Sequence, residues 1–78
     1  MDKNKMKEKA IEILLCDKSK VEEKEVTEIN AMYYRNTDRG GGAVIVSEQG
    51  DMLFVDPFFV DYEEHVKKFM SGERSTFE

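Results

Sequence analysis

The stretch that decides the fold spans residues 41–61 and reads GGAVIVSEQGDMLFVDPFFVD. It holds two short apolar runs, a turn between them, and an apolar loop that leads toward a helix. The unbroken run at residues 43–47 is typical of a central strand that is covered on both faces. The turn at residues 48–51 predicts a hairpin in which Gly50 has a positive φ. A second strand is therefore expected at residues 52–55, ending before a proline that has no N–H for the ladder.

Amphipathic helices are expected before and after this hairpin. Within residues 4–17, apolar side chains recur at positions i, i+4, i+7 and i+8, which predicts a helix of about four turns. After the hairpin, Asp61 is a good N-cap, and Glu64 lies three residues further on, as in a capping box. Gly72 predicts the end of this second helix. Residues 73–78 are expected to form a disordered tail.

A third strand is predicted at residues 26–35, where side chains alternate between two faces and β-branched and aromatic residues are frequent. The face that carries Met32 and Tyr34 is not wholly polar, so we expect either a tail or a partner to cover it. The charged residues 18–25 are interpreted as a linker or a frayed helix end, and the glycine-rich residues 36–42 as a loop.

These elements predict a single α+β domain over residues 1–78. Its expected centre is a three-stranded antiparallel β-meander flanked by an N-terminal and a C-terminal helix, in the order α-β-β-β-α. A small sheet is unstable alone in water, so we expect both helices to cover one face of it. The residues expected to be buried are Ile11, Leu14, Leu15, Ile29, Val44, Val46, Leu53, Val66 and Phe69.

Composition and charge narrow the functional classes. The 78 residues carry a formal net charge of −5, which argues against a general nucleic-acid binder, because such proteins present basic surfaces. No apolar run approaches the roughly 18 residues that a membrane span needs, so no membrane association is expected. The one cysteine, Cys16, cannot form an internal disulfide and is expected to act as a small, partly buried apolar residue. A reducing, cytoplasmic setting is therefore the expectation.

The residues that could carry chemistry form no recognisable catalytic or metal pattern. His65 follows Asp61 by one helical turn, but no second histidine and no nucleophile accompany them, so we expect a surface or boundary histidine. Asp51, Asp56 and Asp61 are spaced by five residues, which is not the alternating pattern of a calcium-binding loop. The glycines at residues 40–42 precede a strand rather than a helix, which disfavours a phosphate site. We therefore expect no catalytic residue, metal or cofactor.

Two features predict a binding surface for another protein. Residues 48–64 contain six acids and no base, which indicates either a solvated face or a negative patch for a basic partner. Phe58 and Phe59 follow a proline, and three consecutive apolar residues at a loop cannot easily all face inward. We expect one or two of them to pack under the second helix and the remainder to anchor a partner. The predicted partner-binding residues are Glu48, Asp51, Asp56, Phe58, Phe59, Glu63 and Tyr34.

The order of these motifs resembles that of a known class of proteins. The residues that carry the resemblance are GAVIV at 42–46, GD at 50–51, YEE at 62–64, and Phe69. They are similar to the C-terminal half of small bacterial immunity proteins of polymorphic toxin systems. The resemblance implies a single-domain inhibitor that binds a toxin or another enzyme, and it transfers no catalytic residue. This sequence has no tryptophan, which such proteins often carry in the first strand.

The functional hypothesis is a small, acidic, non-catalytic module that blocks a partner protein such as a toxin or a nuclease with a basic surface. One alternative is an acidic nucleic-acid mimic from a mobile element that occupies the DNA groove of a nuclease, since the predicted element order and the acidity also resemble those of small phage inhibitors of CRISPR nucleases. Another is a small structural or regulatory homodimer whose open sheet face is buried between the two copies.

Overall fold

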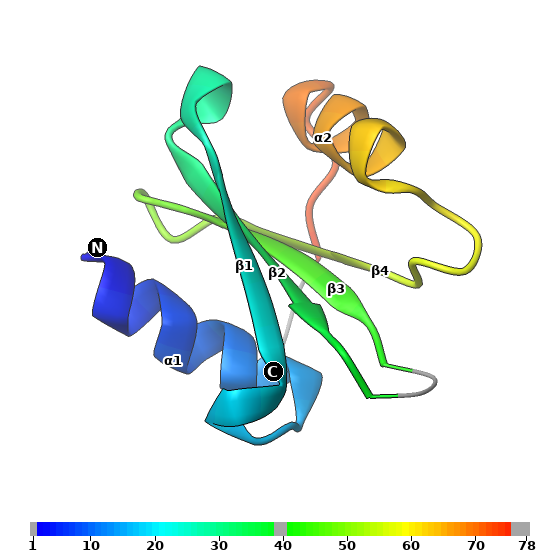
Figure 1. The fold of residues 1–78 in the computed structure, drawn as a ribbon. Coiled ribbons are helices and arrows are strands. Elements are labelled where there is room, and N and C mark those ends of the chain that lie inside the picture. The colour runs from blue at the N-terminus through cyan, green and yellow to red at the C-terminus, as the bar shows by residue number, and fades with distance from the viewer. Residues whose placement is uncertain (1, 39–40, 76–78) are drawn as a thin grey trace.

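The computed structural model describes residues 2–38 and 41–75, and its centre is an antiparallel sheet with one helix on each face (Figure 1). The sheet has four strands in the order β1-β2-β3-β4, so it is a meander in which consecutive strands pair. The α+β class and the antiparallel meander are thus confirmed. The elements are α1 (Lys3–Leu14), β1 (Val21–Val26), β2 (Ala31–Asn36), β3 (Ala43–Ser47), β4 (Met52–Val55) and α2 (Tyr62–Met70), with short 3₁₀ turns at Lys18–Lys20 and Thr27–Ile29.

The first strand of the sheet is one that the sequence pattern did not predict. β1 lies mostly in the charged stretch interpreted as a linker, and it pairs with β2 from Val21 opposite Asn36 to Val26 opposite Ala31. Its four central residues are exposed, so no apolar alternation marks it as a strand. The single strand expected at residues 26–35 is also divided, because a 3₁₀ turn and Asn30, with φ 49°, reverse the chain between β1 and β2.

The two helices cover opposite faces of the sheet, which corrects the expectation that both lie on one face (Figure 1). β3 is buried at all five positions because it lies between the two helices, as the unbroken apolar run predicted. The core under α1 contains Met6, Ala10, Leu14, Met32, Tyr34, Val44 and Val46. The core under α2 contains Ala31, Ile45, Leu53 and Phe69.

The helix α1 ends three residues earlier than its apolar pattern predicted. Leu15 adopts a left-handed conformation with φ 52°, and its N–H donates to the carbonyl of Ile11 at 2.9 Å. This turn moves the Leu15 side chain away from the sheet and leaves it 88% exposed, so its predicted burial is wrong. Among the other predicted core residues, Ile11, Ile29 and Val66 are half-buried, and burial is confirmed for Leu14, Val44, Val46, Leu53 and Phe69.

The second half of the chain follows its local signals closely. The carboxylate of Asp61 accepts a hydrogen bond from the Glu64 N–H at 2.9 Å and so caps α2. Gly50 and Gly72 have φ values of 94° and 101°, as expected of a hairpin turn and a helix stop.

The chain after α2 turns back along the outer edge of β4. The N–H of Ser75 donates to the Met52 carbonyl at 2.8 Å, and its hydroxyl accepts from the Phe54 N–H at 2.9 Å. The guanidinium of Arg74 lies 3.8 Å from the centroid of the Phe69 ring. Residues 73–75 of the predicted disordered tail are thus hydrogen-bonded against the domain, while residues 76–78 lie outside the described residues.

The difference between Leu14 and Leu15 gives a test of the helix boundary. Leu14→Ala removes a buried side chain from the core under α1 and should lower the free energy of unfolding by about 2–5 kcal/mol. Leu15→Ala is the matched control and should change it by less than about 0.5 kcal/mol, because Leu15 lies in solvent. Urea denaturation of both variants measures the difference. Equal losses in the two variants would contradict the observed end of α1.

Candidate functional site

Two adjacent aromatic side chains lie in solvent on the loop between β4 and α2. We call residues 57–60 the aromatic loop. Phe58 is 86% exposed and Phe59 is 76% exposed, so neither phenylalanine packs under α2, whereas Val60, the third apolar residue of the run, is half-buried. Their rings contact each other edge to face, with centroids 5.1 Å apart and an interplanar angle of 80°. The loop therefore presents one continuous apolar surface to solvent.

The aromatic loop is held by local hydrogen bonds to Asp56. The carboxylate Oδ1 of Asp56 accepts from the Phe58 N–H at 2.9 Å. Its backbone carbonyl accepts from the N–H groups of Phe59 and Val60, both at 3.0 Å. The ring of Pro57 fixes one more backbone dihedral. A partner that binds the two phenyl rings would thus have little loop motion to restrict, which lowers the entropic cost of binding.

The six acids of residues 48–64 do not form a single patch. All six are exposed, but Glu48 and Asp51 lie in the turn before β4, whereas Asp56 follows its other end. Asp51 also lies 4.0 Å from Nε of Arg74, which partly neutralises it. The acids beside the aromatic loop are therefore Asp56 and three residues at the start of α2, which are Asp61, Glu63 and Glu64.

The predicted partner-binding residue Tyr34 does not reach the surface. α1 covers the face of the sheet that carries it, and the side chain is fully buried. Burial raises the pKa of Tyr34 to about 12. Its hydroxyl has no hydrogen-bond partner among residues 2–38 and 41–75, so this side chain contributes to the core rather than to a surface.

A groove of about 460 Å³ separates β1 and β2 from the start of α2, and it was not foreseen from the sequence. It exists because α2 packs on β3 and β4 and leaves the β1–β2 half of that face open. The ring of Tyr33 contacts the ring of Tyr62 edge to face at 4.9 Å, and Nζ of Lys24 lies 4.2 Å from the centroid of Tyr62. The lining residues are Glu22, Glu23, Lys24, Tyr33, Arg35, Pro57, Asp61 and Tyr62.

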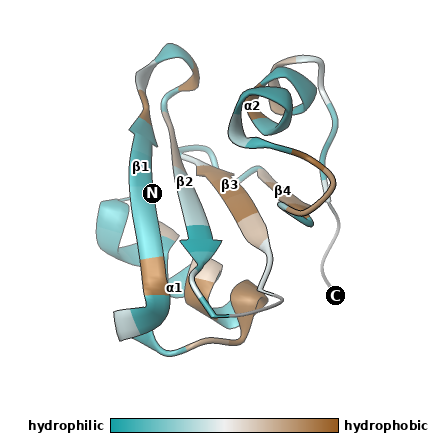
Figure 2. Cartoon of the chain, turned by 45° about the vertical axis from the view of Figure 1, so that its right-hand side comes forward, coloured by the Kyte–Doolittle hydropathy of each residue, from teal (hydrophilic) through white to brown (hydrophobic). Residues whose placement is uncertain are grey.

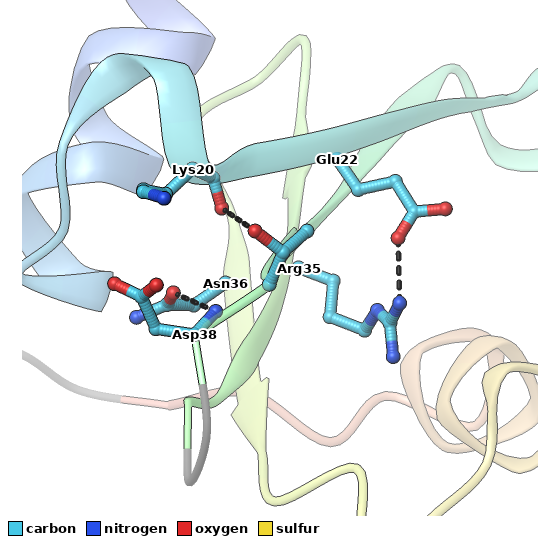
Figure 3. Close-up of polar contacts among 6 residues, drawn as sticks. Lys20, Glu22, Arg35, Asn36 and Asp38 are labelled. Atoms are coloured by element: carbon cyan, nitrogen blue, oxygen red, sulfur yellow. Dashed lines mark hydrogen bonds and ion pairs between the residues drawn. The ribbon is translucent and has the colours of Figure 1, made fainter.

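The two cations on the rim of this groove, Lys24 and Arg35, both have contacts within the chain. Nη2 of Arg35 donates to the Glu22 carboxylate at 2.6 Å (Figure 3), and this bond raises the pKa of Arg35. The turn after β2 is fixed nearby, where the Asp38 N–H donates to the side-chain oxygen of Asn36 at 2.9 Å (Figure 3). Because Arg35 is paired with Glu22 and Lys24 lies over the ring of Tyr62, the groove offers weak attraction for an anionic ligand.

His65 is fully buried, which corrects its predicted position at the surface or boundary. Its Nε2 lies 2.7 Å from the carbonyl oxygen of Leu53, and its ring contacts Tyr33 edge to face at 5.6 Å. A carbonyl only accepts, so Nε2 carries the proton. Nδ1 has no partner among the described residues, and burial lowers the pKa of His65 below its ordinary value of 6.5. This geometry suits a neutral histidine that ties α2 to β4.

In the described residues, no group of three or more histidine, cysteine or acidic side chains is arranged to hold a metal ion. Cys16 is half-buried, and burial raises the pKa of its thiol, which disfavours the reactive thiolate. None of the described helices is both long and apolar enough to cross a membrane. No protein-family model, curated protein or solved structure matches this chain.

The buried histidine predicts a specific dependence of stability on pH. The pKa of His65 is lower in the folded than in the unfolded chain, so its contribution to stability is complete above about pH 6.5. That contribution is lost as the pH falls through the unfolded pKa toward the folded one. Urea midpoints measured from about pH 7.5 to pH 5 should therefore decrease, before most carboxylates are protonated.

His65→Gln provides the matched variant for this measurement. Its amide can donate to the Leu53 carbonyl but does not titrate, so its stability should change less between about pH 6.5 and pH 5. An unchanged slope in this variant would show that other groups cause the pH dependence.

Proposed function

We propose that this chain is a small non-catalytic module that binds and blocks a partner protein through its aromatic loop. The observation that carries the proposal is the exposure of Phe58 and Phe59 on a hydrogen-bonded loop. Full burial of one phenylalanine side chain contributes about 1.5–3 kcal/mol of favourable free energy. The isolated domain does not gain this free energy at either position, because both side chains are exposed. Rigid aromatic anchors of this kind commonly supply most of the binding energy of a protein interface.

The charge around the aromatic loop supports a partner with a basic rim. The acids beside the loop, from Asp56 to Glu64, are exposed and have no lysine or arginine between them in the sequence. Such acids accelerate the association of a basic partner more than they strengthen the final complex. The expected interface therefore has an apolar centre at the two phenyl rings and an acidic margin.

The blocking role and the absence of catalysis rest on two further arguments. The one histidine is buried and hydrogen-bonded to a backbone carbonyl, so it is not placed to act on a substrate at the surface. The resemblance to bacterial immunity proteins favours an inhibitor that works in the cytoplasm on a toxin or nuclease. The face with Tyr34 takes no part in the proposed contact, because α1 covers it.

The apolar part of the proposal is tested by Phe58→Ala/Phe59→Ala. The immobilised parent chain first captures its partner from a lysate of the organism that encodes it, and the purified partner then serves for kinetics. The double variant should dissociate at least about fivefold faster, which corresponds to about 1 kcal/mol. Leu15→Ala is the control, because Leu15 is equally exposed but directly follows α1, at the far side of the sheet. A variant that dissociates like the control would reject the aromatic loop as the anchor.

The electrostatic part is tested by Glu63→Gln/Glu64→Gln against Glu8→Gln/Glu12→Gln. Both pairs remove two exposed charges, but the second pair lies on α1. Only the first pair should slow association, and salt should slow the parent in the same way, since the screening length is about 8 Å at physiological ionic strength. Equal effects of the two pairs would contradict local steering. Competition by duplex DNA with a steep salt dependence would favour a nucleic-acid mimic instead.

A further inference from the structure

The strand β1 has an outer edge with unpaired backbone groups. In an antiparallel pair, residues bond alternately to the neighbouring strand and away from it. The Thr37 N–H donates to the Lys20 carbonyl at 2.8 Å, which makes Val21 and Asn36 a non-hydrogen-bonded pair. The backbone groups of Val21, Glu23 and Glu25 therefore point away from β2. They have no hydrogen-bond partner within the part of the chain that the structure describes.

The opposite edge of the sheet is not equally open. The outward Met52 carbonyl and Phe54 N–H of β4 are both bonded to Ser75, which lies on the segment that returns from α2 (Figure 1). A second chain could therefore extend the sheet far more readily at β1 than at β4. If the added chain is another copy, β1 pairs with β1, and such a two-fold contact closes after two copies instead of growing into a fibre.

The side chains of β1 are charged, and Figure 2 shows the strand as hydrophilic along most of its length, in contrast to β3. Charged side chains on an edge usually oppose pairing. Here each carboxylate of β1 already has a cation from a neighbouring element, which removes much of the repulsion. The pairs are Glu22 with Arg35 at 2.6 Å, Glu23 with Lys7 at 3.8 Å, and Glu25 with Lys3 at 3.0 Å.

We propose that two copies of this chain pair antiparallel through β1 and form one continuous sheet. In such a pair, the residues whose backbone groups point outward must lie opposite each other. The register centred on Glu23 pairs all three of them, because it places Glu23 opposite Glu23 and Val21 opposite Glu25. This register also places Glu22 of each copy opposite Lys24 of the other copy, which forms two pairs of opposite charge across the interface. A second copy fits this locally neutralised edge better than a strongly basic peptide does, because each of the three carboxylates of β1 already has a cation.

Glu23→Pro tests this contact directly. The Glu23 N–H points outward, so proline removes a donor of the proposed interface and no bond to β2. Sedimentation equilibrium from about 20 μM to about 1 mM should show a concentration-dependent dimer of the parent, weakened at least about tenfold in this variant. Glu8→Gln, on the exposed side of α1, should leave the dimer unchanged.

Two further measurements keep the proposal falsifiable. If Glu23→Pro does not fold, amide hydrogen exchange on the parent decides, because the N–H groups of Glu23 and Glu25 should exchange more slowly at about 1 mM than at about 20 μM. Phe58→Ala/Phe59→Ala should still dimerise, since the aromatic loop belongs to a different surface. A parent that stays monomeric, equal exchange at both concentrations, or a dimer lost in the phenylalanine variant and kept in Glu23→Pro would each overturn the proposal.

Discussion

The removal of β3 from water on both of its faces is the constraint on which the rest of the structure depends. All five of its residues are buried, and successive side chains point to opposite sides of the sheet. Val44 and Val46 therefore need a cover on one side and Ile45 on the other, and each of the two helices supplies one cover. The domain consequently has two small cores that share one strand. Neither core is large, which is why single contacts such as the bond from His65 to Leu53 matter to the docking of a whole helix.

Local signals allowed much of the C-terminal half to be predicted. β3, β4, the Asp61 cap and the positive φ angles at Gly50 and Gly72 each follow from residues within a few positions of one another. The placement of the helices was wrong because it was argued from the general need of a small sheet for cover. The sequence of β3 predicts covers on both faces, because successive side chains of a strand point to opposite faces and its first four residues are all apolar.

The strand β1 and the groove beside it could not be read from the sequence for a physical reason. An edge strand is held by backbone bonds and ion pairs to its neighbours, and neither leaves an apolar period in the sequence. The groove that brings Lys24, Tyr33 and Tyr62 together depends on the position of β1, so it cannot be inferred from the other strands alone. The acidic patch expected over residues 48–64 is divided for a different reason, because closeness in sequence does not give closeness in space when the strand β4 separates Asp51 from Asp56. His65 lies three residues after Tyr62 and four before Phe69, so helical spacing alone could have placed it on the buried side.

The aromatic loop is the feature that folding does least to explain. A chain of 78 residues buries only about 60% of the surface that its unfolded form exposes, so it has few large apolar side chains to spare. The fold nevertheless leaves Phe58 and Phe59 outside both cores, while smaller residues such as Ala10, Ala31 and Ala43 occupy fully or almost fully buried positions. The turn itself needs only the Asp56 carboxylate and the following N–H groups, which polar side chains at positions 58 and 59 would supply equally well. Neither packing nor turn geometry calls for two phenylalanines there, and this is the physical reason for proposing the aromatic loop, rather than another exposed segment, as a binding surface.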